Sequence, residues 1–202
     1  MGVEVWWSSL TAADGDALTL LDATERARLD ALDSPADRGR SLVGAALLRV
    51  AVAARLGVDP RDVAVDRTCV DCGRPHGAPR VVGPEHDDVR RTVWVSVSHS
   101  GLLVVVALGD APVGVDVQRE ADLRADAPAW ARHEAEVKLH GAVTARGGLI
   151  ADAPDATTTP LATPLAGYAA ALATAGVPGA VVVRHWPGPD GGPVGDADDG
   201  TA

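Results

Sequence analysis

The chain has 202 residues, 47% of them hydrophobic, and a formal net charge of −10 at pH 7. This length and apolar content are enough for one large domain or two small ones with a buried core. The acidic balance argues against a general nucleic-acid binder and against docking on anionic membranes, because both favour basic surfaces.

The N-terminal sequence "MGVEVWWSSL" lacks the basic region of a signal peptide, and no run of about 18 apolar residues predicts a membrane span. The two cysteines of the chain suit a reducing compartment. We therefore expect a cytoplasmic protein that makes no membrane contact.

The first elements follow from hydrophobic periodicity and capping residues. "VEVWWSSL" (residues 3–10) predicts a strand, and "LLDATERARLDAL" (20–32) predicts a helix with Asp22 as N-cap and Glu25 three residues later. Apolar residues at helical spacing predict a longer helix over residues 35–56, ended by Gly57. "DVAVDRT" (62–68) predicts a short strand.

Residues 69–92 are polar and rich in turn formers. Three strands should follow, "VWVSVS", "LLVVVAL" and "PVGVDV", joined by tight antiparallel turns at "HSG" and "GDA". The alternation in the first of them predicts a strand with one face in water. "APAWARHEAEVKLHGAV" (127–143) predicts a helix, residues 151–165 a loop, and "GYAAALAT" and "GAVVVRHW" a last pair of strands.

The last of these helices carries the only lysine of the chain. Trp130, Glu134 and Lys138 are four residues apart, so they should share one helix face. One interpretation is a solvated ion pair worth ~0.3–0.5 kcal/mol. The large apolar Trp130 on the same face favours a more enclosed setting and hence a functional role.

Asp116 interrupts an apolar strand and should point away from Val115 and Val117. It either faces water or needs a partner or a metal ion. Gly114 on the same face would leave space for a ligand.

His99 lies at a predicted hairpin tip between Ser98 and Ser100, as a plain turn residue or as a phosphate or sugar contact. Arg38 and Arg40 lie near a helix start, where they are ordinary surface arginines or bind a phosphate.

Four segments occur in order: "RSLVGAALLR" (40–49), "VSVSHSGLLVVVAL" (95–108), "GVDVQ" (114–118) and "WARHEAEVK" (130–138). The series resembles the 4'-phosphopantetheinyl transferases of the surfactin type. Those enzymes carry a G-V/I-D-V/I-E motif followed by an F/W-x-x-K-E-A/S-x-x-K motif. The resemblance covers about residues 20–145.

These enzymes move the 4'-phosphopantetheine arm from coenzyme A to a serine of an apo carrier protein and release 3',5'-ADP. The resemblance implies a Mg²⁺-dependent transferase and an α+β fold. The fold would have two similar α/β halves about a pseudo-twofold axis, each a small antiparallel-rich sheet on a long helix. Residues 1–92 would contact coenzyme A, residues 93–186 would carry the metal and catalytic motifs, and residues 187–202 would be a disordered tail.

The resemblance also implies roles for matched residues. Asp116 and Glu134 would hold Mg²⁺ with Gln118 as a third ligand, and Glu134 would take the proton of the carrier serine. Lys138 would act on the pyrophosphate as a third catalytic residue. Coenzyme A would be held by Arg28, Arg40, Ser98, His99 and Lys138, with Arg40 on the 3'-phosphate. The partner would be an apo acyl or peptidyl carrier, and a less acidic peptidyl or polyketide carrier suits the charge of −10 best. One chain with both halves would suffice as a monomer.

Three positions depart from the family pattern. Gln118 stands in place of Glu, His133 in place of Lys, and Ala78 in place of a basic residue, for which Arg74 or Arg80 could substitute. They keep open the alternative of a non-catalytic module that binds coenzyme A or a carrier protein. A second alternative is a coenzyme A- or nucleotide-dependent transferase of other chemistry that uses the same carboxylates.

"CVDCGRPH" offers Cys69, Cys72 and His76 as zinc ligands, with His86 as a candidate fourth. The other interpretation is a turn with two free thiols.

Overall fold

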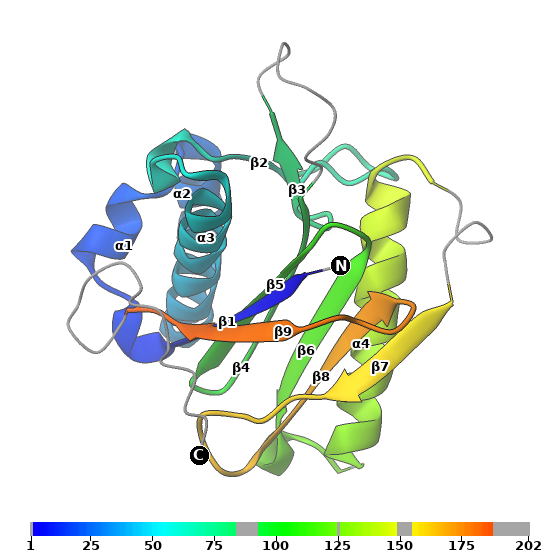
Figure 1. Ribbon diagram of the computed structural model, residues 1–202. Helices are drawn as coiled ribbons and strands as arrows, with labels where there is room; N and C mark the ends of the chain where they lie inside the picture. Colours follow the sequence, from blue (N-terminus) through cyan, green and yellow to red (C-terminus); the bar gives the residue numbers. More distant parts are fainter. Residues whose placement is uncertain (1, 84–92, 125, 149–154, 188–202) are drawn as a thin grey trace.

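The computed structural model of the chain describes residues 2–83, 93–124, 126–148 and 155–187. One strand is followed by three α-helices, then by a run of strands, a further long helix and three last strands (Figure 1). The helices are α1 (Gly15–Thr19), α2 (Ala23–Asp30), α3 (Pro35–Leu56) and α4 (Ala127–Ala145). The strands are β1 (Val3–Ser9), β2 (Ala64–Asp66), β3 (Arg80–Val82), β4 (Trp94–Ser100), β5 (Leu103–Gly109), β6 (Val113–Arg119), β7 (Ala156–Pro160), β8 (Tyr168–Ala175) and β9 (Val181–His185).

The predicted cap of α2 and the predicted end of α3 are confirmed, whereas the short helix α1 was not predicted. At α2, the Asp22 side chain accepts a hydrogen bond from the Glu25 amide, and the Glu25 carboxylate accepts one from the Asp22 amide. This reciprocal capping box pairs two backbone donors that a helix start leaves free. At the end of α3, Gly57 takes the left-handed conformation with φ of 71°.

The strands form three sheets, with orders β4-β5-β1-β9, β6-β8-β7 and β2-β3. Helix α3 packs on one face of the first sheet, and the β6-β8-β7 sheet covers the other face. Helix α4 lies on the far side of the β6-β8-β7 sheet, so the two long helices enclose two sheets (Figure 1). The α+β class is therefore confirmed.

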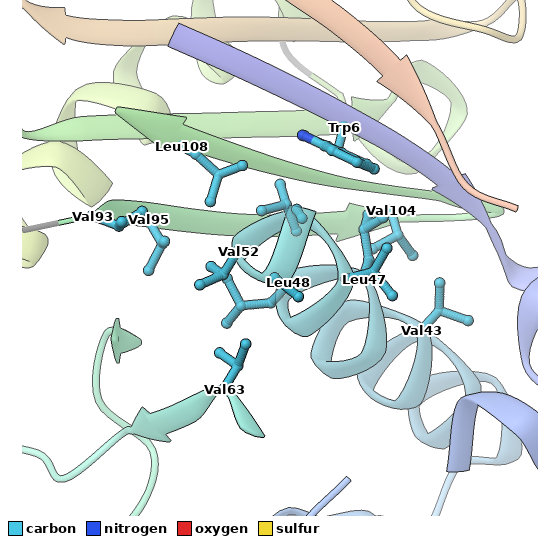
Figure 2. Packing of buried hydrophobic residues seen from close by; sticks show 14 of the residues in the cluster. Trp6, Val43, Leu47, Leu48, Val52, Val63, Val93, Val95, Val104 and Leu108 are labelled. Carbon is cyan, nitrogen blue, oxygen red and sulfur yellow. The ribbon is translucent and has the colours of Figure 1, made fainter. Parts of the chain in front are cut away.

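The alternation of side chains in the central strands explains this layering. On β1, Trp6 joins Leu47, Leu48 and Val52 of α3 in the first core (Figure 2). Its neighbour Trp7 points to the opposite side and packs against the β6-β8-β7 sheet.

Strands β4 and β6 run side by side, and serine side chains join them in place of a backbone ladder. Val115 N–H donates to Ser96 Oγ at 3.0 Å and Val117 N–H to Ser98 Oγ at 3.3 Å. Arg119 N–H donates to Ser100 Oγ at 2.9 Å. All three hydroxyls are buried, so the prediction that this face of β4 meets water is wrong.

Gly114 is the point where α4 touches β6. A Cβ atom at residue 114 would overlap the carbonyl oxygen of Ala135 and lie 2.6 Å from the amide nitrogen of Leu139. The expectation that Gly114 leaves space for a ligand is therefore wrong, because the backbone of α4 fills that space.

Other expectations need correction as well. Part of the predicted 151–165 loop forms β7, because its threonines pair with β8. The turn-rich 69–92 segment contains β3. The strands predicted as a final pair lie in different sheets: β8 pairs with β6, whereas β9 pairs with β1. β6 does not pair with β5 but turns into the other sheet.

The first sheet combines β1 with β4 and β5, so it joins strands from both sides of the division expected at residues 92–93. Residues 188–202 of the expected tail lie outside the described residues. Among the described residues, no helix combines the length and apolarity needed to cross a bilayer.

Replacing Gly114 with Ala should lower the free energy of unfolding by about 3 kcal/mol or more, because the new Cβ forces α4 away from β6. Urea denaturation measures this loss. Gly141→Ala is the matched control on α4, since nothing lies within 4 Å of a Cβ there. It should raise stability by up to about 1 kcal/mol. Equal stability of the two variants would contradict the close contact.

Candidate functional site

A pocket of about 280 Å³ opens where α2, α3, β4, β6 and α4 meet. The side chains on its walls come from segments far apart in the sequence. Its polar and charged lining residues are Arg28, Ser41, Arg67, Ser98, His99, Asp116, Gln118, Glu134 and Lys138. Every predicted site residue except Arg40 therefore lines one pocket, and Ser41 and Arg67 are additions.

Asp116 is the most buried ionisable group of the pocket, with 5% of its surface exposed. As predicted, it points away from Val115 and Val117, toward α4. Its Oδ1 accepts hydrogen bonds from Ser98 Oγ at 2.7 Å and from Lys138 Nζ at 2.6 Å. Its Oδ2 is buried and has no hydrogen-bond partner. A buried carboxylate oxygen without a donor is suited to bind a cation.

Ser98 fixes the direction of this carboxylate. Its hydroxyl accepts from the Val117 amide and donates to Asp116 Oδ1, so one side chain ties the backbone of β6 to the site. The sequence placed Ser98 as a coenzyme A contact and did not reveal this link, which depends on β4 lying beside β6.

Lys138 forms its ion pair with a residue of strand β6 and not with a residue of its own helix α4. Its ammonium contacts Asp116 on β6, so the alternative interpretation of an i,i+4 ion pair with Glu134 is wrong. Among the described residues, the half-buried Glu134 has no hydrogen bond or ion pair and faces the pocket. Trp130 is 43% exposed at the pocket rim, so the inference that it is enclosed is also wrong.

Two arginines also line the pocket. Arg28 comes from α2, and Arg67 follows β2. Burial, together with repulsion from Arg28, lowers the pKa of Arg67 to about 10, so it stays charged at neutral pH. Arg67 Nε is buried without a partner. Two cations that repel one another, one with an unused donor, fit an anion with several oxygens.

The position of Arg28 depends on Arg49, a buried side chain that is 2% exposed. Arg49 reaches from α3 to Glu25 at 2.7 Å and to Asp22 at 2.8 Å, and it also donates to the carbonyl of Val63. These bonds clamp the first turn of α2 onto α3. Loss of both acidic partners would leave the buried charge of Arg49 uncompensated.

Arg40 is absent from the pocket lining. Its guanidinium is ion-paired with Asp37 and donates to the carbonyl oxygen of Gly101 at 3.2 Å. It thereby supports the β4–β5 turn that follows His99.

His99 lies within β4 opposite Val104, one position before the strand ends, and not at the hairpin tip. Its ring faces the pocket, yet the surrounding protein displaces much of the water that would otherwise hydrate the imidazole. This desolvation, reinforced by Arg40 and Lys138, lowers the pKa of His99 below its ordinary value of 6.5, against the opposing effects of a backbone hydrogen bond and Asp37. The imidazole is therefore neutral at pH 7 and becomes a cation more readily when an anion lies beside it.

The remaining sequence candidates lie outside the pocket lining. His133 is exposed on α4. Arg80, a possible substitute for a basic residue at position 78, is bound to Asp66 and to the carbonyl of Ala145. His86 lies outside the described residues.

The chain matches no family model, and no curated protein matches it at a significant level. The chemistry of the pocket must therefore be inferred from its own residues.

Titration of His99 by NMR should give a pKa below 6.5 in the free protein and a higher pKa with inorganic phosphate present. The unfolded chain takes up a proton at His99 at a higher pH than the folded chain does. The free energy of unfolding should therefore fall as the pH drops below about 6.5, and His99→Gln should reduce this slope. A pKa at or above 6.5 in the free protein would contradict the desolvation.

Proposed function

We propose that this protein transfers the 4'-phosphopantetheine arm of coenzyme A to a serine of an apo carrier protein, with Mg²⁺, and releases 3',5'-ADP. The observation that carries the proposal is one pocket lined by Asp116, which has a partnerless buried oxygen, by a free Glu134 and by two arginines. A polyanionic ligand that binds together with a cation would match both the carboxylates and the arginines.

The residues present fit Mg²⁺. Asp116, Glu134 and Gln118 line the pocket and together offer two carboxylates and an amide oxygen, and Mg²⁺ prefers oxygen ligands from one or two carboxylates. Gln118 would add an oxygen without charge. When bound, the ion would offset the negative charge of the pyrophosphate.

The arginines of the pocket would hold the nucleotide end of coenzyme A. Arg28, Arg67 and the hydroxyl of Ser41 fit its 3'-phosphate. The role of Arg40 at that phosphate stays a prediction, because Arg40 would have to leave Asp37 to reach it. Lys138 and His99 would contact the pyrophosphate, where a compact ammonium and a titratable imidazole suit its charge.

Glu134 would act as the general base. It is half-buried, faces the pocket and has no described partner, so its carboxylate is free to take the proton of the carrier serine. The serine oxygen would then form a bond to the β-phosphorus of coenzyme A, while the bond to the bridging oxygen of 3',5'-ADP breaks. Positioning and charge compensation would supply most of the rate, as in phosphoryl transfer generally.

The fold supports the same proposal. Helix α3 with its sheet and helix α4 with the β6-β8-β7 sheet would be the two pseudo-twofold halves of a monomer, with the site between them. The protein would act in the cytoplasm on a peptidyl or polyketide carrier. A catalytically weakened module that binds coenzyme A or a carrier is the second candidate, favoured by Gln118, His133 and Ala78.

The direct test is incubation with coenzyme A, Mg²⁺ and an apo peptidyl carrier, followed by intact-mass measurement of the carrier. A gain of one phosphopantetheine arm is expected. Binding of coenzyme A without any mass gain would support the non-catalytic module, and absence of binding would contradict both candidates.

Asp116→Asn and Glu134→Gln should each reduce the transfer rate at saturating Mg²⁺ by about a hundredfold or more, because the first removes a charged metal ligand and the second removes the base. Glu136→Gln is the matched control: Glu136 is exposed on the same helix and outside the pocket. It should transfer at the wild-type rate. A wild-type rate in Glu134→Gln would eliminate the proposed base.

Arg67→Ala should weaken coenzyme A by about tenfold to a hundredfold, which is 1.5–3 kcal/mol for a charged hydrogen bond. Dephospho-coenzyme A should be weakened much less. Isothermal titration with both ligands measures the difference. Arg61→Ala, an exposed arginine paired with Asp59, serves as control. Equal losses for both ligands would remove Arg67 from the 3'-phosphate.

A further inference from the structure

The loop between β2 and β3 gathers three metal-ligating side chains away from the pocket. The Sγ atoms of Cys69 and Cys72 and a ring nitrogen of His76 all lie within 4.8 Å of one another. The Cys72 Sγ and the His76 Nε2 are 2.9 Å apart. Both thiols are free. Among the described residues, this is the one such group.

The backbone of the loop is shaped to present these ligands. Gly73 N–H donates to the Cys69 carbonyl at 2.9 Å, and Gly73 takes φ of 71°, which L residues with side chains rarely adopt. The turn closed by this bond brings Cys72 back toward Cys69, so the two sulfur atoms lie on the same side of the loop as His76.

Short backbone bonds hold the third ligand in place. The His76 amide donates to the Arg74 carbonyl at 2.9 Å, and the Cys69 amide donates to the same carbonyl at 2.8 Å. Gly77 N–H donates to the Arg67 carbonyl at 2.7 Å, which closes the loop at its base. The loop thus begins at the arginine that lines the pocket.

The donor set decides which ion fits. Two thiolates and an imidazole are soft or borderline ligands, which suit Zn²⁺ and not Mg²⁺. The Asp71 carboxylate lies 3.9 Å from Cys69 Sγ. Its negative charge opposes a thiolate when no cation is present and adds to the attraction for one. The ligands are exposed or half-exposed, so an ion has direct access to them.

We propose that Cys69, Cys72 and His76 bind one Zn²⁺, with solvent at the fourth position. The ion cross-links the loop 69–76 and thereby steadies the backbone at Arg67. This site is separate from the pocket and does not depend on the proposed transfer reaction.

The test is titration of the full chain, stripped of metal and kept reduced, with Zn²⁺ in competition with a chromophoric chelator. Co²⁺ is then used as a spectroscopic probe. One equivalent should bind, and Co²⁺ should give thiolate-to-metal charge-transfer absorption. Cys72→Ser and His76→Ala should each weaken Zn²⁺ by about a hundredfold or more, beyond the 10–100-fold typical of changes to outer-sphere partners. His185→Ala, an exposed histidine on β9, should bind like wild type.

Two results would overturn the proposal: no Co²⁺–thiolate absorption in the reduced chain, or equal affinity in Cys72→Ser and wild type. Loss of both free thiols in air with no metal uptake would assign the pair to a disulfide instead. Circular dichroism of each variant checks that it is folded. Because neither coenzyme A nor a carrier is present, failure here and failure of the transfer assay are separate outcomes.

Discussion

The buried charge of Asp116 is the constraint on which the rest of the site depends. A carboxylate that is 5% exposed in the middle of a strand is stable only with close partners. Lys138 and Ser98 supply them, one from α4 and one from β4. Lys138 can reach Asp116 because Gly114 lets α4 touch β6, and Ser98 can reach it because serines join β4 to β6. The packing of α4 and β4 against β6 thus supplies both partners of the Asp116 carboxylate.

Both partners of Asp116 bind Oδ1, and Oδ2 has no hydrogen-bond partner. Asp116 is therefore a candidate metal ligand as well as a member of an ion pair. Helix α2, which carries Arg28 to the pocket, is held on α3 by a second ionic cluster around the buried Arg49, and Arg67 begins the cysteine-containing loop. The acidic and basic residues of the pocket therefore come from different structural units. A ligand with several negative charges and an accompanying cation would match both, as the proposed coenzyme A with Mg²⁺ would.

Local sequence signals predicted local structure well. The capping box of Asp22 and Glu25, the left-handed Gly57 and the two long helices needed only neighbouring residues. The resemblance supplied the site residues, and all but Arg40 line the pocket. What the sequence did not reveal depends on tertiary contacts: Lys138 pairs with a strand and not with Glu134, and Arg67 is one arginine among many until the fold points it inward. The strand β7 was missed because its pairing with β8 overrides its turn-rich composition.

The most direct measurement of the central claim, that Asp116 Oδ2 is a cation ligand, is the affinity for Mn²⁺ in the presence of coenzyme A, read by electron paramagnetic resonance. We expect Asp116→Asn to bind Mn²⁺ at least about tenfold more weakly than wild type, because it loses a charged oxygen ligand. Asp122→Asn, which changes an exposed carboxylate 3.7 Å from Arg119, should bind Mn²⁺ like wild type. Equal Mn²⁺ affinity in wild type and Asp116→Asn would contradict the claim.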